Sequence, residues 1–174
     1  KTMDLNNENY FSQEAKETYM GFTQFKQFCN CEAKAMAIIN GEYVPESTTA
    51  LLVGSYVDAY FSGEMEQFNA SHPEIFTRNG ELKADFRSAE DIIKTIENDE
   101  MLMKYLSGQP QVVMIGEIAG VPFKIKMDSY HPEKVIVDQK IMKDMEPVWV
   151  EQDGFNKKVN FVEAYRYDLE GAIY

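Results

Sequence analysis

The sequence predicts an α/β fold in which helices precede a three-stranded antiparallel sheet and a further helix follows it. In the first half of the chain apolar residues recur at helical spacing, whereas from Gln111 onward they follow the two-residue period of strands. Short gaps separate the three strand segments, as in hairpins. We therefore expect a single domain, with a helical part over about 1–108 and a sheet-plus-helix core over about 109–174.

Composition limits the classes of function open to the chain. Hydrophobic residues make up 44% of it, which is enough for a substantial core, and no apolar run reaches the about 18 residues of a membrane-spanning helix. The formal net charge of −12 argues against wide, non-specific binding of nucleic acid through a basic surface. Any contact with DNA should therefore be local. We expect a soluble, cytoplasmic protein that does not contact a membrane.

Two helices are predicted in the first third of the chain. The first covers about 24–39, where Phe25 and Phe28 share an apolar stripe and the two cysteines fit as reduced packing residues. The second is the segment TALLVGSYVDAYFSG, capped by Ser47 or Thr48. Within it Asp58 lies at the margin of the apolar stripe.

The remaining helices are predicted from caps and breakers. Residues 69–87 carry Pro, Gly and mixed charge, which predicts a structured loop. A capped amphipathic helix follows over 88–106 and ends before Gly108. After a charged stretch near Gly154, helical spacing returns over 159–174, so we expect a helix that covers the sheet.

Two acidic residues should meet in the predicted sheet. A hairpin that folds about position 133 pairs Asp128, at the end of the strand over 121–128, with Asp138 in the strand over 135–140. Directly opposed residues have Cβ atoms about 4.5–5.5 Å apart. Because strand side chains alternate between faces, Lys140 lies on the same face as Asp138.

Converging carboxylates point to a cation. Two adjacent carboxylates repel each other unless a proton or a cation lies between them, and Mg²⁺ prefers such hard oxygen ligands. Lys140 then has the position to orient a nucleophile or to offset negative charge in a transition state. The alternative is that Asp128, Asp138 and Lys140 form a solvated strand face with an ion pair.

The ordered set of segments resembles the PD-(D/E)XK nucleases, and within them the RecE/RecB-like and phage-type exonucleases. The segment GEIAGVPFKIKMDSYHPEKVIVDQK is similar to that family's meander with one acid followed by D-x-K. ALLVGSYVDAYF resembles its G-x-x-(H/D) helix, and YRYDLEGAIY resembles its Q-x-x-x-Y helix. The resemblance implies a restriction-endonuclease-like αβββαβ core, with the final strand beyond the end of this chain.

Site residues follow from the resemblance position by position. It implies that Asp128 and Asp138 bind the metal, that the Gln139 carbonyl is a further ligand, and that Lys140 is the catalytic lysine. Asp58 occupies the place of a helical metal-binding His, and its carboxylate can also bind Mg²⁺.

Two more positions depart from the family pattern. Glu170 stands where the family has Gln, with Tyr174 four residues later, and this pair is implied to position DNA. Ile141 follows the lysine where Thr is common. A carboxylate near a phosphate is repulsive unless a metal or a basic group intervenes.

The expected function is that of a Mg²⁺-dependent DNA exonuclease, with Mn²⁺ able to substitute. Such an enzyme, of the kind used in phage or mobile-element recombination, hydrolyses phosphodiester bonds by a metal-activated water. The resemblance implies DNA as substrate, and admits a single-strand annealing protein and a second copy of the chain as partners. Two alternatives stay open: a catalytically degraded nuclease fold that binds DNA or assists assembly, and an unrelated acidic interaction domain.

Overall fold

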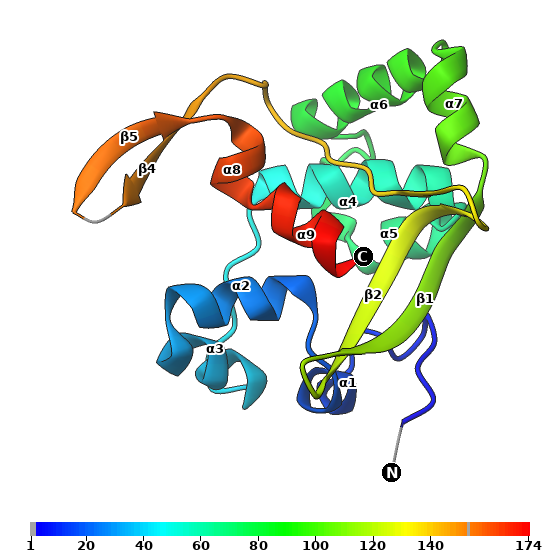
Figure 1. Cartoon of the computed structure of the whole chain (residues 1–174). Coiled ribbons are helices and arrows are strands. Elements are labelled where there is room, and N and C mark those ends of the chain that lie inside the picture. Colours follow the sequence, from blue (N-terminus) through cyan, green and yellow to red (C-terminus); the bar gives the residue numbers. More distant parts are fainter. Residues whose placement is uncertain (1–2, 153) are drawn as a thin grey trace. The chain divides into compact units, whose positions relative to one another are not determined.

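The first part of the chain is helical, as the sequence predicts (Figure 1). The computed structural model describes residues 3–152 and 154–174. The helices of this part are α1 (Gln13–Thr18), α2 (Phe22–Asn30), α3 (Glu32–Ile39), α4 (Thr49–Ser62), α5 (Met65–Ser71), the short 3-10 helix η1 (Pro73–Ile75), α6 (Ala84–Glu97) and α7 (Glu100–Leu106). Within the described residues, no helix is long and apolar enough to cross a membrane.

The main apolar core lies between α4 and α6. The ring of Tyr56 on α4 meets that of Phe86 on α6 with centroids 5.7 Å apart. The buried residues of this core are Tyr56, Val57, Ile75, Phe86, Ala89, Ile93 and Ile96. As predicted, Thr48 caps α4, its side chain accepting a hydrogen bond from the Leu51 amide, and Gly63 ends it in the left-handed conformation at φ 78°. This packing fixes the helix that carries Asp58.

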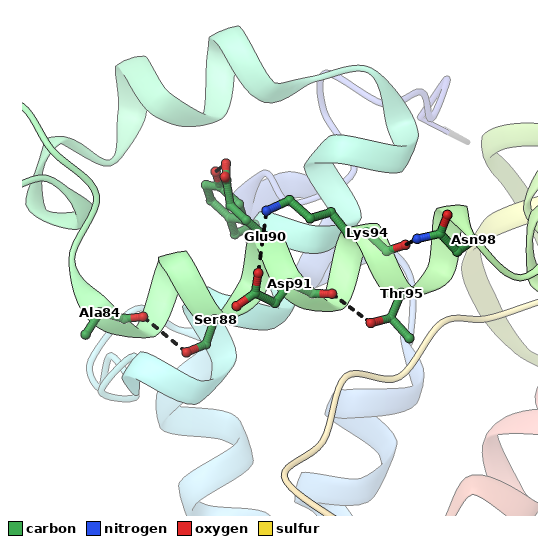
Figure 2. Close-up of polar contacts among 8 residues, drawn as sticks. Ala84, Ser88, Glu90, Asp91, Lys94, Thr95 and Asn98 are labelled. Atoms are coloured by element: carbon green, nitrogen blue, oxygen red, sulfur yellow. Dashed lines mark hydrogen bonds and ion pairs between the residues drawn. The ribbon is translucent and has the colours of Figure 1, made fainter.

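The outer face of α6 is polar and makes its own contacts (Figure 2). Thr95 and Asn98 donate to the carbonyls of Asp91 and Lys94, each at 2.8 Å. Lys94 pairs with Asp91 at 3.5 Å, with both side chains largely exposed. This face is an ordinary solvated helix surface, and its Asp–Lys pair is a useful reference for the pair in the candidate site.

The prediction of one continuous helix over 24–39 is wrong, because the structure has two helices there. Cys31 has an extended backbone, with φ −162° and ψ 105°, which separates α2 from α3. Cys29 and Cys31 are both free and exposed, so they are not packing residues. The apolar spacing continues through the break, which is why periodicity alone did not reveal it.

Two boundaries in the next segment also differ from the prediction. The expected loop over 69–87 contains the end of α5 and the start of α6, because Phe86 enters the core and extends that helix toward the N-terminus. The expected helix over 88–106 is divided at Asp99. The carboxylate of Asp99 accepts hydrogen bonds from the amides of Met101 and Leu102 and so caps α7.

The predicted antiparallel meander is confirmed. Strands β1 (Gln109–Ile118), β2 (Val121–His131) and β3 (Val135–Val137) form one sheet in the order β1-β2-β3. Ser129 pairs with Val137 and His131 with Val135, which is the register predicted for the second hairpin. The third strand is shorter than the predicted 135–140 and ends before Asp138.

A second compact unit runs from Met142 to Tyr174, and the first ends at Ile141. The second unit contains the hairpin of β4 (Val148–Gln152) and β5 (Phe155–Val159), followed by α8 (Phe161–Tyr165) and α9 (Tyr167–Ile173). The sequence had not suggested this hairpin. Arg166, at φ 60°, breaks the expected helix over 159–174 into α8 and α9. The assignment of the whole chain to one domain stays a prediction.

Candidate active site

Asp128, Asp138 and Lys140 lie together at one end of β2. Extending the pairing of β2 with β3 by one residue places Asp138 opposite Asp128. The Gln139 amide donates a hydrogen bond of 2.6 Å to Asp128 Oδ2, which ties the segment after β3 to β2. Lys140 Nζ lies 2.6 Å from Asp138 Oδ2, and both side chains are partly buried. The two residues predicted to lie together thus form an ion pair, although β3 ends at Val137 and the pair lies beyond the strand.

The third carboxylate comes from α4. Asp58 is half-buried, and its Oδ1 accepts a hydrogen bond of 3.0 Å from Gln111 Nε2 on β1. Pro110 pairs with Ser129 and Val112 with Met127, so Gln111 stands opposite Asp128 in the sheet. Gln111 is only 5% exposed and has φ 52°, a conformation that non-glycine residues seldom adopt. Thus Gln111 links the helix acid to the strand acids.

The carboxylates change one another's affinity for protons. The pKa of Asp128 is raised to about 7, first by burial and then by the charges of Asp58 and Asp138, against the opposing Gln139 hydrogen bond and Lys140 charge. Burial also raises the pKa of Asp58, while the charge of Lys126 and the Gln111 hydrogen bond lower it. Such crowding of like charges is the condition that a bound cation relieves.

The oxygen atoms present suit a small divalent cation. Among residues 3–152 and 154–174, no three or more His, Cys, Asp and Glu side chains already stand in position to hold a metal ion. However, the candidate site offers the carboxylates of Asp58, Asp128 and Asp138. In addition, Gln139 Oε1 is buried without a hydrogen-bond partner. Carboxylate oxygens are the hard ligands that Mg²⁺ and Mn²⁺ prefer, and the backbone of Gln139 is held against one of them, Asp128, by a hydrogen bond of 2.6 Å. Asp58, Asp128, Asp138 and Gln139 as ligands nevertheless stay a prediction.

The remaining predicted positions lie elsewhere in the chain. Glu170 and Tyr174 belong to the second unit, where the Tyr174 amide donates to the Glu170 carbonyl at 3.0 Å along α9. Their part in positioning DNA stays a prediction. Ile141 packs against the core of the first unit, which accounts for an apolar residue at that position.

Sequence reasoning missed Gln111 and Lys126. Both signals were available: Gln111 is a polar residue at the start of an apolar strand, and Lys126 precedes Asp128 by two residues on the same strand face. The contact of Gln111 with Asp58 joins residues 53 positions apart, and periodicity carries no information about such a pair.

Comparisons with known proteins place the chain in a family. Residues 21–174 match the family model described as a PDDEXK-like domain of unknown function (DUF3799). The chain is also similar to a crystal structure titled as a putative exonuclease from Eubacterium rectale, with 49% sequence identity and a TM-score of 0.93. That similarity covers 99% of this chain and 66% of the other, so this chain spans slightly less than two thirds of its neighbour. No curated protein matches the chain.

Proposed function

Because the chain belongs to the family of PDDEXK-like domains, we propose that it is a metal-dependent deoxyribonuclease that hydrolyses phosphodiester bonds as an exonuclease. One observation carries the proposal: Asp58, Asp128 and Asp138 act on one another electrostatically, and Lys140 pairs with Asp138 beside them. The name of the structural neighbour supports this choice.

The acids and the lysine take different roles. In the proposal Asp58, Asp128 and Asp138 hold the cation through carboxylate oxygens, and Gln139 adds an amide or backbone oxygen. A bound Mg²⁺ or Mn²⁺ would supply Lewis-acid stabilisation of the charge on the phosphoryl oxygens. Lys140 has no lone pair for a metal when it is charged, so its role is with the water or with the substrate.

The residues of the chain itself prepare the reaction. Asp138 holds the Lys140 ammonium at 2.6 Å, and in the proposal this ammonium stabilises the negative charge that develops on the scissile phosphate. Protonated Asp128 cannot hold a cation well. Because its pKa is about 7, Asp128 must lose its proton near neutral pH before it can bind a metal ion.

The finer features of the proposal rest on the sequence and on the resemblance. They are Mg²⁺ as the resident ion, a cytoplasmic setting, a role in phage or mobile-element recombination, and a single-strand annealing protein or a second copy as partner. The chain would contact DNA locally, since its net charge of −12 does not favour a broad electrostatic footprint.

The deciding experiment separates the two members of the central ion pair. Asp138→Ala should abolish Mg²⁺-dependent cleavage of linear duplex DNA and weaken metal binding, whereas Lys140→Ala should abolish cleavage and leave calorimetric metal binding intact. Asp91→Ala and Lys94→Ala, which alter the exposed pair on α6, are the matched controls and should change neither (Figure 2).

Three results would redirect the proposal. Cleavage at the wild-type rate by either site variant would refute the nuclease mechanism. Binding of DNA by the wild type without cleavage under any divalent metal would favour the alternative of a DNA-binding module. Loss of metal binding in a folded Lys140→Ala variant would show that the lysine also organises the ligands.

A further inference from the structure

We propose that Phe11 is a stacking surface for an unpaired base of the DNA strand that enters the site, and that Lys126 beneath it contacts the strand's backbone. The inference rests on the proposed function and adds a substrate contact to it. Phe11 lies in the segment before α1, outside residues 21–174 that match the family model. Its side chain is 68% exposed.

The segment that carries Phe11 is fastened to β2. The ammonium of Lys124, a residue only 5% exposed, donates to the Tyr10 carbonyl at 2.6 Å and lies 4.6 Å from the centroid of the Tyr10 ring. Farther along, Met20 forms a bridge with Phe123, and the Lys124 amide donates to the Met20 carbonyl at 3.0 Å. Figure 1 shows this N-terminal segment, in blue, beside the β1–β2 hairpin.

The turn before Phe11 is also built by specific contacts. The Asn6 amide donates to Asn9 Oδ1 at 2.8 Å, and Asn6 Oδ1 accepts from the Glu8 and Asn9 amides. Asn9 Nδ2 further donates to the Asp4 carbonyl at 2.8 Å. After the turn, Ser12 caps α1. The backbone of Phe11 is therefore held between a closed turn and a capped helix, which limits the backbone entropy that this segment would lose on binding.

Lys126 connects Phe11 to the carboxylates. Its ammonium lies 5.5 Å from the centroid of the Phe11 ring. Lys126 and Asp128 are two residues apart on one face of β2, a separation of about 6.5 Å along a strand. The charge of Lys126 also acts on Asp58. An exposed aromatic ring and a cation thus lie next to the proposed reaction centre, which is the combination that binds single-stranded nucleic acid.

A purely structural role does not account for the ring of Phe11. Its edge-to-face contact with Tyr10 has centroids 4.9 Å apart, but most of its surface remains in water and so adds little to folding. A second aromatic–lysine pair, Tyr43 with Lys34 at 5.2 Å, offers the same chemistry. Tyr43 and Lys34 are not among the causes of the pKa shifts of Asp58 and Asp128, so this pair is a matched control.

The test measures stacking and catalysis separately. The probe is a single-stranded oligonucleotide with 2-aminopurine at its end, because stacking on an aromatic ring quenches its fluorescence. Binding is measured in the Asp138→Ala background to prevent cleavage, and KM and kcat are measured in the otherwise wild-type protein. Phe11→Ala should lose the quenching, weaken binding about 5- to 150-fold and raise KM with little change in kcat, since stacking on one base is worth about 1–3 kcal/mol.

Companion variants sharpen the result. Phe11→Trp should retain the quenching, Tyr43→Ala should behave like its parent protein, and Lys126→Met should lower the salt dependence of binding by about one phosphate contact. Unchanged quenching and KM in Phe11→Ala, or an equal loss in Tyr43→Ala, would overturn this inference while leaving the nuclease proposal intact. If the wild type neither binds nor cleaves DNA, the proposed function fails, and this inference with it.

Discussion

Two charged residues on the same face of β2 have opposite surroundings: the first is partnered by the chain itself, and the second lies near further charges of its own sign. Lys124 and Asp128 are four residues apart, and burial is the main cause of both pKa shifts: it lowers that of Lys124 to about 8 and raises that of Asp128 to about 7. At the Lys124 end, the Tyr10 carbonyl and ring compensate the charge. At the Asp128 end, the neighbours include two further carboxylates, whose negative charges destabilise the ionised form of Asp128.

Under the proposed function, this difference is that between a structural charge and a metal-binding one. A buried ion is costly unless the protein supplies a partner, and at Lys124 the partner is part of the chain itself. At Asp128 the Gln139 amide and the Lys140 charge offset only part of the repulsion from Asp58 and Asp138. The remaining imbalance calls for a proton or an external cation, as expected of a site built for a metal.

Replacing Asp128 should give the largest effect on function. Asp128→Asn keeps the shape of the side chain but removes its charge, so cleavage should fall by at least about 10³-fold, which is several kcal/mol of lost stabilisation. The rise in melting temperature that Mg²⁺ or Mn²⁺ gives to the wild type should disappear as well. Without metal the variant should be more stable than the wild type at pH 8, because a neutral amide avoids the cost of burying a charge and relieves the repulsion from Asp58 and Asp138.

Differential scanning calorimetry and a nuclease assay check this prediction together. Asp91→Asn, at the exposed acid of α6, is the control and should retain both cleavage and metal stabilisation (Figure 2). A metal-induced rise in melting temperature that survives in Asp128→Asn would show that the cation binds elsewhere, and the contrast between the two ends of β2 would lose its functional meaning.

Lys124 should make the stability of the fold depend on pH. The pKa of Lys124 is about 8 in the folded chain and near 10.5 when the chain is unfolded, so the unfolded state binds more protons between these values. Stability should therefore rise as pH increases from about 8 to 10.5, by on the order of 3 kcal/mol from this residue. Lys124→Met should lack this increase.

Urea unfolding at several pH values measures this increase as the difference in unfolding free energy between the wild type and Lys124→Met. Lys134→Met, at an exposed lysine in the β2–β3 turn, should follow the wild-type curve. Parallel curves for the wild type and Lys124→Met would mean that the lysine is neutral or well hydrated in the folded protein, and that the two ends of β2 are more alike than the structure indicates.

What could be predicted from the sequence was local or periodic. The register that places Asp138 opposite Asp128 follows from a short turn. The ion pair of Lys140 with Asp138 lies beyond the end of β3, so the strand alternation that predicted a shared face does not explain it. The break at Cys31 was missed because the apolar spacing continues through it. The Lys124–Tyr10 contact spans 114 residues, and no pattern along the chain encodes such a distance.

The smallest expected effect concerns Gln111, which acts on the site only through Asp58. Gln111→Met keeps the length of the side chain but removes the donor, so Asp58 should be held less firmly and metal affinity should fall by about 10- to 100-fold. Isothermal titration with Mn²⁺ measures the change, and Gln67→Met on the exposed surface of α5 is the control. In an Asp58→Ala background the same substitution should cost nothing further, because its only route to the metal is gone. An additional loss in that background would mean that Gln111, which stands opposite Asp128, serves the strand carboxylate directly.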